Sequence, residues 1–352
     1  MWGACIVFFQ AALLLGYTYA HYIMRWMGIR KYRLWHCILF LLPFLTFPGQ
    51  PLSLRYTLPN LPMVVGVFWQ LLLILGPVFF MLATVSVVWQ SWLAHSDLPE
   101  KTNPYTLFAV SNFGSFAALL TYPFLFEMYF DLQMQQNIWR VYYVVLVVLQ
   151  FYALRIIPFS SIEKEPEVKT ETVEKEIWLQ WLLYSAAGVV VFLAATNVLT
   201  SEVAPIPLLW IIPLSIYLLA FVLNFKQKPW CPKIIQKGIF SFVSFGILYY
   251  FLIGLQYLPM LFESILMLFL TFVYCMFCQF QLHELKPKKV SQLTRYYLVM
   301  SLGGFLGGIF VTWAIPLISS SYVEFILGLL MIVVARQIGS KKYTLNWQAF
   351  IY

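Results

Sequence analysis

The chain has 352 residues, of which 62% are hydrophobic and 19% aromatic, while only 10% are charged. Soluble domains average about 45–50% apolar and about 25% charged residues, so this composition excludes an ordinary soluble protein and predicts an integral membrane protein. The net charge of +8 would suggest nucleic acid in a soluble domain, but here the basic residues lie in loops between apolar runs, so we expect no nucleic-acid partner.

The apolar runs predict an all-α fold. A hydrocarbon core of about 30 Å takes roughly 20 helical residues. By that criterion the chain has about eleven transmembrane helices, at residues 4–24, 34–48, 63–93, 104–126, 136–157, 177–199, 206–225, 238–255, 259–282, 296–317 and 321–338. The third run is long enough to tilt strongly or to bend at Gly76-Pro77. The first run has no basic residues ahead of it, so we expect no cleavable signal peptide.

The basic residues predict the orientation of these helices. If the N-terminus is outside, all Lys and Arg residues except Arg55 and Arg140 fall in inner loops or the C-terminal tail. This asymmetry is typical of a multi-pass protein of the bacterial inner membrane, with the N-terminus outside and the C-terminus cytoplasmic. A charged stretch predicts a cytoplasmic linker between two halves. The expected parts are an N-terminal transmembrane half at 1–158, the linker at 159–176, a C-terminal transmembrane half at 177–338 and a cytoplasmic tail at 339–352.

An internal repeat supports the division of the chain into two related halves. At an offset of 190, Ser111 aligns with Ser301 and Gly114 with Gly304. In hydrocarbon, helices associate through close packing and hydrogen bonds, and small residues let their backbones approach. We therefore predict two pseudo-repeated halves that use small-residue faces as contacts. The predicted helix-packing residues are Gly114, Gly303, Gly304, Gly307 and Gly308.

The cysteines do not predict a redox or metal site. Cys275 and Cys278 have the spacing of a redox or metal motif, but they lie within an apolar run and no second Cys pair exists for a zinc site. Packing as small apolar side chains is the favoured interpretation. We predict no catalytic residue, no metal and no cofactor.

Polar residues within or beside the spans are the candidates for solute binding. Gln10, Asn112 and Asn197 need partners away from lipid, either a solute or a neighbouring helix. His283 and Glu284, at an inner helix end, would either relay protons or cap the helix beside a basic cluster. Glu202, at the outer end of the sixth span, is either a solvated acid or part of a vestibule.

Several runs resemble a known family. The runs are Phe8-Phe9-Gln10 to His21, Asn103-Pro104-Tyr105 to Pro123, Glu202 to Leu214, His283-Glu284-Leu285, and Leu293-Thr294 to Gly304. Together they resemble the membrane domain of the bacterial fused MFS/spermidine synthase proteins. The resemblance implies an MFS-like (major-facilitator-like) layout and transport of a small solute, such as a polyamine or another cationic amine. The alternative is a non-transporting membrane subunit that anchors or feeds a separately encoded, polyamine-synthase-like enzyme.

The chain departs from that family in two ways. It has no Rossmann-like segment and no glycine-rich nucleotide loop, so we expect it not to be an enzyme. The resembling proteins carry one more helix ahead of the first run, and Trp2 mirrors Trp210 after the sixth span. We therefore expect an upstream apolar segment, a partner subunit or a second copy to pack beside the first span, where Gln10 and Gly16 lie.

Overall fold

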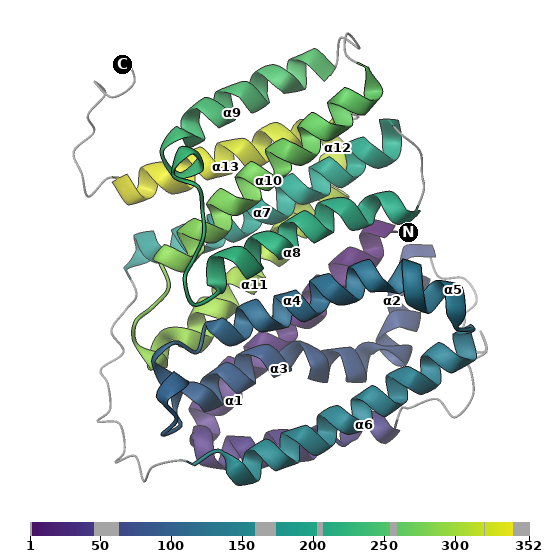
Figure 1. Cartoon of the computed structure of the whole chain (residues 1–352), viewed down its shortest axis with the longest axis vertical. Helices are drawn as coiled ribbons and strands as arrows, with labels where there is room; N and C mark the ends of the chain where they lie inside the picture. The colour runs from purple at the N-terminus through teal and green to yellow at the C-terminus, as the bar shows by residue number, and fades with distance from the viewer. Residues whose placement is uncertain are drawn as a thin grey trace. The chain divides into compact units, whose positions relative to one another are not determined.

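A computed structural model shows a helical protein (Figure 1) and describes residues 2–45, 63–158, 174–202, 207–253, 259–319 and 321–340. These ranges contain helices and turns but no strand. Eight of the helices are long and apolar enough to cross a membrane, and two shorter apolar helices accompany them. The prediction of an all-α, multi-pass membrane fold is thereby confirmed.

The contacts divide the chain into two compact units. Unit 1 is Met1–Glu167 with Lys288–Ser301, and unit 2 is Val168–Pro287 with Leu302–Tyr352. The first boundary falls in the predicted linker, most of which lies outside the described residues. The stretch Lys288–Ser301 belongs to the first unit by its contacts, although it lies in the second half of the sequence.

Unit 1 starts with a helix that joins the first two predicted spans. Gly28 has a φ of 73°, a conformation that L side chains rarely adopt, and the helical path changes direction there. Pro77 follows the start of the next long helix, so the long third run is divided at Leu75, between Ile74 and Gly76. The elements are α1 (Trp2–Leu39), a 3₁₀ turn (Leu42–Leu45), α2 (Met63–Ile74), α3 (Gly76–Ala94), a 3₁₀ turn (Pro99–Thr102), α4 (Thr106–Thr121), a π-helical turn (Tyr122–Phe126), α5 (Glu127–Tyr129) and α6 (Leu132–Ile156).

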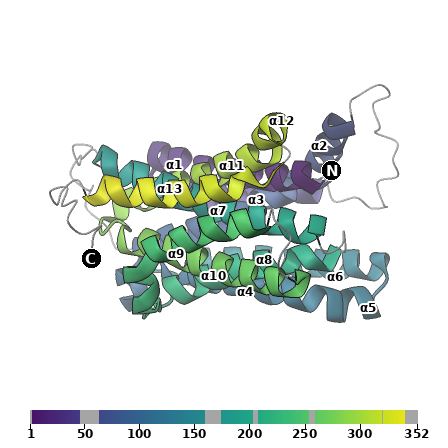
Figure 2. The same cartoon turned by 90° about the horizontal axis from the view of Figure 1, so that it is seen from above.

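Unit 2 is built around α7. This helix packs along α13 and α10 and also contacts α8, and 83% of its most apolar stretch is buried. Figure 2 shows α7 between α13 and α10. The elements are α7 (Lys175–Glu202), a 3₁₀ turn (Pro207–Trp210), α8 (Ile211–Phe225), α9 (Lys233–Ile253), α10 (Met260–Glu284), a π-helical turn (Phe310–Ala314), α12 (Ile315–Ile318) and α13 (Val323–Ser340). The helix α11 (Leu293–Ile309) belongs to unit 1 up to Ser301 and to unit 2 from Leu302. A 3₁₀ turn (Val290–Gln292) precedes α11.

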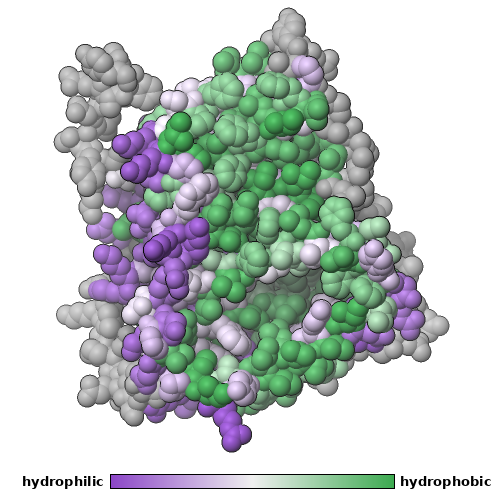
Figure 3. Space-filling view, viewed as in Figure 1, coloured by the Kyte–Doolittle hydropathy of each residue, from purple (hydrophilic) through white to green (hydrophobic). Residues whose placement is uncertain are grey.

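The surface of the helices suits a bilayer. In Figure 3 the flanks of the helices are predominantly apolar, while hydrophilic side chains gather at helix ends. In unit 2, Lys233 and Lys237 lie at the start of α9, and Lys286 lies just beyond the end of α10. Basic residues at helix ends and apolar residues along the flanks are the arrangement that a hydrocarbon layer between two aqueous phases favours.

Candidate functional site

A buried amide on α10 is the strongest feature of unit 2. Gln279 is fully buried, and neither its amide nitrogen nor its amide oxygen has a hydrogen-bond partner among the described residues. A Cβ placed on Gly188 of α7 would lie 3.3 Å from Gln279 Nε2 and 3.4 Å from Cε2 of Tyr217 on α8. Gln279 therefore lies where α7, α8 and α10 meet, and a side chain at position 188 would press against its amide.

The hydroxyl of Ser215, on α8, is also buried without a partner in the part of the chain that the structure describes. Buried polar groups in proteins are nearly always hydrogen-bonded, to protein or to ordered water. An amide with both ends unpaired therefore marks a place for water or for a polar ligand. Gln279 was not among the residues predicted from the sequence, because a single Gln in an apolar run resembles many structural glutamines.

Unit 1 has a glutamine in a similar place but with its partners present. Gln90 lies near the C-terminal end of α3 and is fully buried. Tyr297 Oη donates to Gln90 Oε1 at 2.5 Å, and Gln90 Nε2 donates to the Ser86 carbonyl oxygen at 3.0 Å. The rings of Tyr297 and Tyr17 are 6.2 Å apart. This network fastens the first part of α11 to α1 and α3.

At the other end of unit 2, two side chains pair across helices. Asn197 of α7 donates from Nδ2 to Glu324 Oε1 of α13 at 3.1 Å. Glu324 is 3% exposed, and its second carboxylate oxygen has no partner among the described residues. Asn197 was predicted to bind solute, whereas Glu324 was not among the predicted binding residues. The structure shows a buried carboxylate with one oxygen available for a donor.

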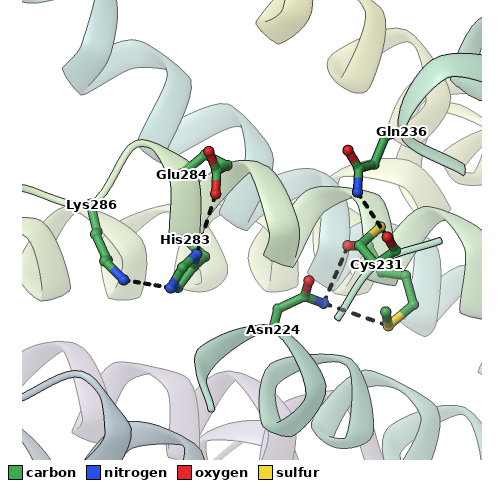
Figure 4. Close-up of polar contacts among 7 residues, drawn as sticks. Asn224, Cys231, Gln236, His283, Glu284 and Lys286 are labelled. Carbon is green, nitrogen blue, oxygen red and sulfur yellow. Dashed lines mark hydrogen bonds and ion pairs between the residues drawn. The ribbon is translucent and has the colours of Figure 1, made fainter. Parts of the chain in front are cut away.

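His283 and Glu284 lie at the C-terminal end of α10 (Figure 4). His283 Nε2 is 2.5 Å from Lys286 Nζ, and His283 Nδ1 is 3.6 Å from a carboxylate oxygen of Glu284. An ammonium group can only donate, so Nε2 is the acceptor, and a neutral imidazole then carries its proton on Nδ1, toward Glu284. Burial lowers the pKa of Lys286, and the Glu284 carboxylate opposes that shift. Lys286, His283 and Glu284 thus form a linear polar cluster at the C-terminal end of α10.

The same view shows how α8 and α10 are held together near this row. Asn224 of α8 donates from Nδ2 to the Ala220 carbonyl oxygen at 2.8 Å and lies 3.4 Å from the Met276 carbonyl oxygen of α10 (Figure 4). The His283 ring meets the ring of Phe225 edge-on, with centroids 5.5 Å apart. Packing on one side and Lys286 on the other fix the orientation of the imidazole.

The remaining predicted binding residues are Gln10 and Asn112 of unit 1 and Glu202 of unit 2. Gln10 lies on α1 with its amide oxygen buried and unpaired among the described residues. Asn112 donates to the Phe108 carbonyl oxygen of its own helix at 2.8 Å. Glu202 is the last residue of α7, and its side chain lies outside the described part. Within unit 2, Asn197 lies near the C-terminal end of α7 and His283 lies at the C-terminal end of α10, and the roles of all the predicted residues stay predictions.

The predicted packing glycines differ in what surrounds them. A Cβ on Gly303 would lie 2.5 Å from the Leu182 carbonyl oxygen, and one on Gly307 would lie 2.9 Å from that of Ala186. A Cβ on Gly304 would make an ordinary contact of 3.5 Å with Val189, while Gly308 is buried. A Cβ on Gly114 would meet no atom within 4 Å. In α11, therefore, Gly303 and Gly307 allow the closest approach to α7.

The described ranges contain no candidate metal site. They contain no group of three or more His, Cys, Asp or Glu residues that could hold a metal ion. Cys275 and Cys278 are free and buried, and Cys275 Sγ lies 3.9 Å from the Gly188 carbonyl oxygen. Both thiols are enclosed within the packed interior around α10.

No family model matches the sequence, and no curated protein matches it either. Among solved structures, one described as the MFS (major facilitator superfamily) proton:xylose symporter XylE bound to 6-bromo-6-deoxy-D-glucose is similar to it. The match covers 97% of this chain and 85% of that chain, with a TM-score of 0.58 and 15% sequence identity. At this identity the similarity shows the fold alone, and that fold is MFS-like, an all-α membrane architecture.

Proposed function

We propose that the protein is a multi-pass membrane transporter of a small polar solute. The single observation that carries this proposal is Gln279, a fully buried amide whose two polar atoms have no partner among the described residues. Such a group in a transmembrane helix costs free energy unless water or a solute satisfies it. The MFS-like fold supports a transporter, and the unpaired buried amide of Gln279, beside Gly188 and Tyr217, supports a polar cargo.

Two chemical classes of solute suit a buried amide. An amide offers both a donor and an acceptor, so it can bind a hydroxyl or an amine. At the other end of unit 2, as a separate group, the second oxygen of Glu324 is buried and unpaired among the described residues, and it favours a cationic amine such as a polyamine, because a buried carboxylate needs a positive partner. The amine class also accords with the family that the sequence resembles.

The test is uptake by the purified full chain in proteoliposomes, with labelled spermidine, putrescine and a neutral pentose as probes. We expect Gln279→Leu to lower uptake of the transported probe by about tenfold or more, the size expected when a buried hydrogen bond to a solute is lost. The same variant should keep or gain thermal stability, because it removes an unsatisfied amide. Gln281→Leu, a half-buried neighbour on the same helix, is the matched control and should leave uptake unchanged.

Two results would contradict the proposal. One is uptake by Gln279→Leu equal to that of the wild type. The other is no uptake of any probe by the wild-type chain together with co-purification of a stoichiometric enzyme. The second result would favour a non-transporting subunit that anchors or feeds that enzyme. The basic residues at helix ends support a bacterial inner-membrane location with the N-terminus outside, which a labelling experiment tests separately.

A further inference from the structure

Two arginines from distant parts of the sequence come together in unit 1 without an acceptor for their guanidinium groups. Arg25 lies just before Gly28, at the end of the first arm of α1, and Arg295 lies in the first turn of α11. Both belong to unit 1, and both lie within electrostatic range of the His21 ring. Neither guanidinium group has a hydrogen bond or an ion pair within the described ranges.

The ring of His21 adds a further nitrogen donor beside them. His21 Nδ1 is 2.8 Å from the hydroxyl oxygen of Thr294, which is buried. That hydroxyl has no other acceptor in the part of the chain that the structure describes, so it donates to Nδ1. A neutral imidazole then carries its proton on Nε2, which has no partner among the same residues. The Thr294 hydroxyl thus fixes the orientation of a ring whose other N–H is unused.

His21, Arg25 and Arg295, which we call the basic cluster, present donors and positive charge without a negative partner. No Asp or Glu of the described ranges lies within ion-pair distance of either arginine. Like charges held close together repel, so this arrangement is favoured only when an anion lies among them. A guanidinium group presents its N–H donors in one plane, a geometry that matches two oxygens of a phosphate group. The basic cluster therefore has the chemistry of a phosphate site.

Two exposed aromatic side chains adjoin the basic cluster. Tyr22 is 60% exposed and Trp26 is 83% exposed. They lie about one turn apart on α1, each next in sequence to a member of the cluster, so the aromatic and basic side chains form adjacent stripes. The rings of His21 and Tyr22 are 5.1 Å apart. Tyr and Trp side chains are enriched at the level of lipid headgroups, because their rings are apolar at one end and polar at the other.

We propose that the basic cluster of unit 1 binds the phosphate of an anionic phospholipid. Arg25 and Arg295 bind the phosphate oxygens, and His21 donates to the same group from Nε2. The rings of Tyr22 and Trp26 lie against the glycerol and the upper part of the acyl chains. A zwitterionic headgroup carries an ammonium group that the arginines repel, so a lipid with a net negative charge is favoured. A bound lipid would connect the first arm of α1 to the start of α11, whatever solute the protein carries.

The test is native mass spectrometry of the delipidated full chain with equal amounts of dioleoyl phosphatidylglycerol and dioleoyl phosphatidylcholine. We expect a saturable preference for phosphatidylglycerol. Each basic residue near a membrane surface changes the affinity for anionic lipid by about fivefold, so Arg25→Gln and Arg295→Gln should each lower the preference by about that factor. The double variant should lower it further. Arg155→Gln removes the same charge from an exposed position near the end of α6, and it should leave the preference unchanged.

A second measurement separates loss of the lipid from loss of the fold. Without anionic lipid, the double variant should unfold at the same temperature as the wild type or higher, because it removes a repulsion and no hydrogen bond of the described chain. Phosphatidylglycerol should raise the unfolding temperature of the wild type and not that of the double variant. Trp26→Ala should also weaken lipid binding, which binding of a free anion does not require. Equal binding of the two lipids by the wild type would overturn the proposal, as would an undiminished preference in the double variant or displacement of the lipid by millimolar inorganic phosphate.

Discussion

Asn197 near the end of α7 donates a hydrogen bond of 3.1 Å to Glu324 in the first turn of α13, across 127 residues of sequence. The carboxylate is 3% exposed. A negative charge in the first turn of a helix is favoured by the unpaired N–H groups there. The asparagine adds a donor from a second helix, so the pair ties these ends of α7 and α13 together.

The first prediction concerns this pair. Asn197→Leu should destabilise the protein by about 1–3 kcal/mol, because it leaves a buried carboxylate without its side-chain donor. Adding Glu324→Leu should recover part of that loss, since replacing both partners by apolar groups is less costly than removing one. Thermal unfolding in mild detergent measures both. Ser201→Ala, which removes an exposed hydroxyl bonded within α7, is the control. A double variant no more stable than Asn197→Leu would contradict the coupling.

The second prediction distinguishes two adjacent glycines. Gly303→Ala should destabilise unit 2 by about 1–3 kcal/mol, because a Cβ there would press on the Leu182 backbone, which cannot move without moving α7. Gly304→Ala should cost little, because its Cβ would make an ordinary contact with Val189. The measurement is again thermal unfolding, with Gly114→Ala as a control that adds a methyl into open space. Equal losses for positions 303 and 304 would be incompatible with this geometry.

These glycines show how far the sequence predicts the fold. The bilayer sets the length of each apolar run, so the runs predict most spans to within a few residues, and the repeat at an offset of 190 relates α4 to α11 from the residues alone. The repeat does not show that Gly303, rather than Gly304, makes the closest contact, because the rotation of a helix is decided by the neighbour it packs against. The apolar runs likewise predict a loop at residues 25–33, whereas the helix continues through it with a change of direction at Gly28. A single glycine at positive φ leaves no periodic signal.

The candidate site was less predictable, for a similar reason. Asn197 and His283 could be selected because polar residues near membrane spans are rare. Whether such a residue is satisfied depends on partners far along the chain, and these appear only in three dimensions. Gln90 has Tyr297 as a partner from 207 residues away, whereas Gln279 has none among the described residues. No local pattern in the sequence distinguishes the two glutamines.

The third prediction tests the network around Gln90. Tyr297→Phe removes the hydroxyl that donates to Gln90 Oε1 and should destabilise unit 1 by about 1–3 kcal/mol, because the buried acceptor then has no donor. Tyr22→Phe, at a tyrosine that is 60% exposed, should change the unfolding temperature little. Combining Tyr297→Phe with Gln90→Leu should cost less than the sum of the single variants. Strict additivity of the two losses would argue against the hydrogen bond.

The fourth prediction uses a thiol outside the membrane spans. Burial raises the pKa of Cys231 to about 11. The thiolate is the reactive form, and an ordinary cysteine has a pKa near 8.5, so at about pH 8 Cys231 should react with iodoacetamide far more slowly than a free cysteine. Its rate should rise about tenfold for each pH unit up to about pH 10, while that of a free cysteine levels off above about pH 9. A Cys5→Ser variant leaves Cys231 as the only cysteine that is not fully buried. A plateau near pH 9 would show that the thiol is not perturbed.

The last prediction concerns orientation in the membrane. All Lys and Arg residues except Arg55 and Arg140 fall in inner loops or the C-terminal tail when the N-terminus is outside. Positively charged loops are retained on the cytoplasmic side during insertion, so Lys164 and Lys342 should be cytoplasmic and Arg55 external. Single cysteines at these three positions, in a chain whose own cysteines are replaced, can be probed with a membrane-impermeant maleimide on intact cells. Position 55 should be labelled at once, and positions 164 and 342 only after the membrane is opened. Labelling of position 164 from outside would reverse the assignment, because the basic loops would then lie on the outer face of the membrane.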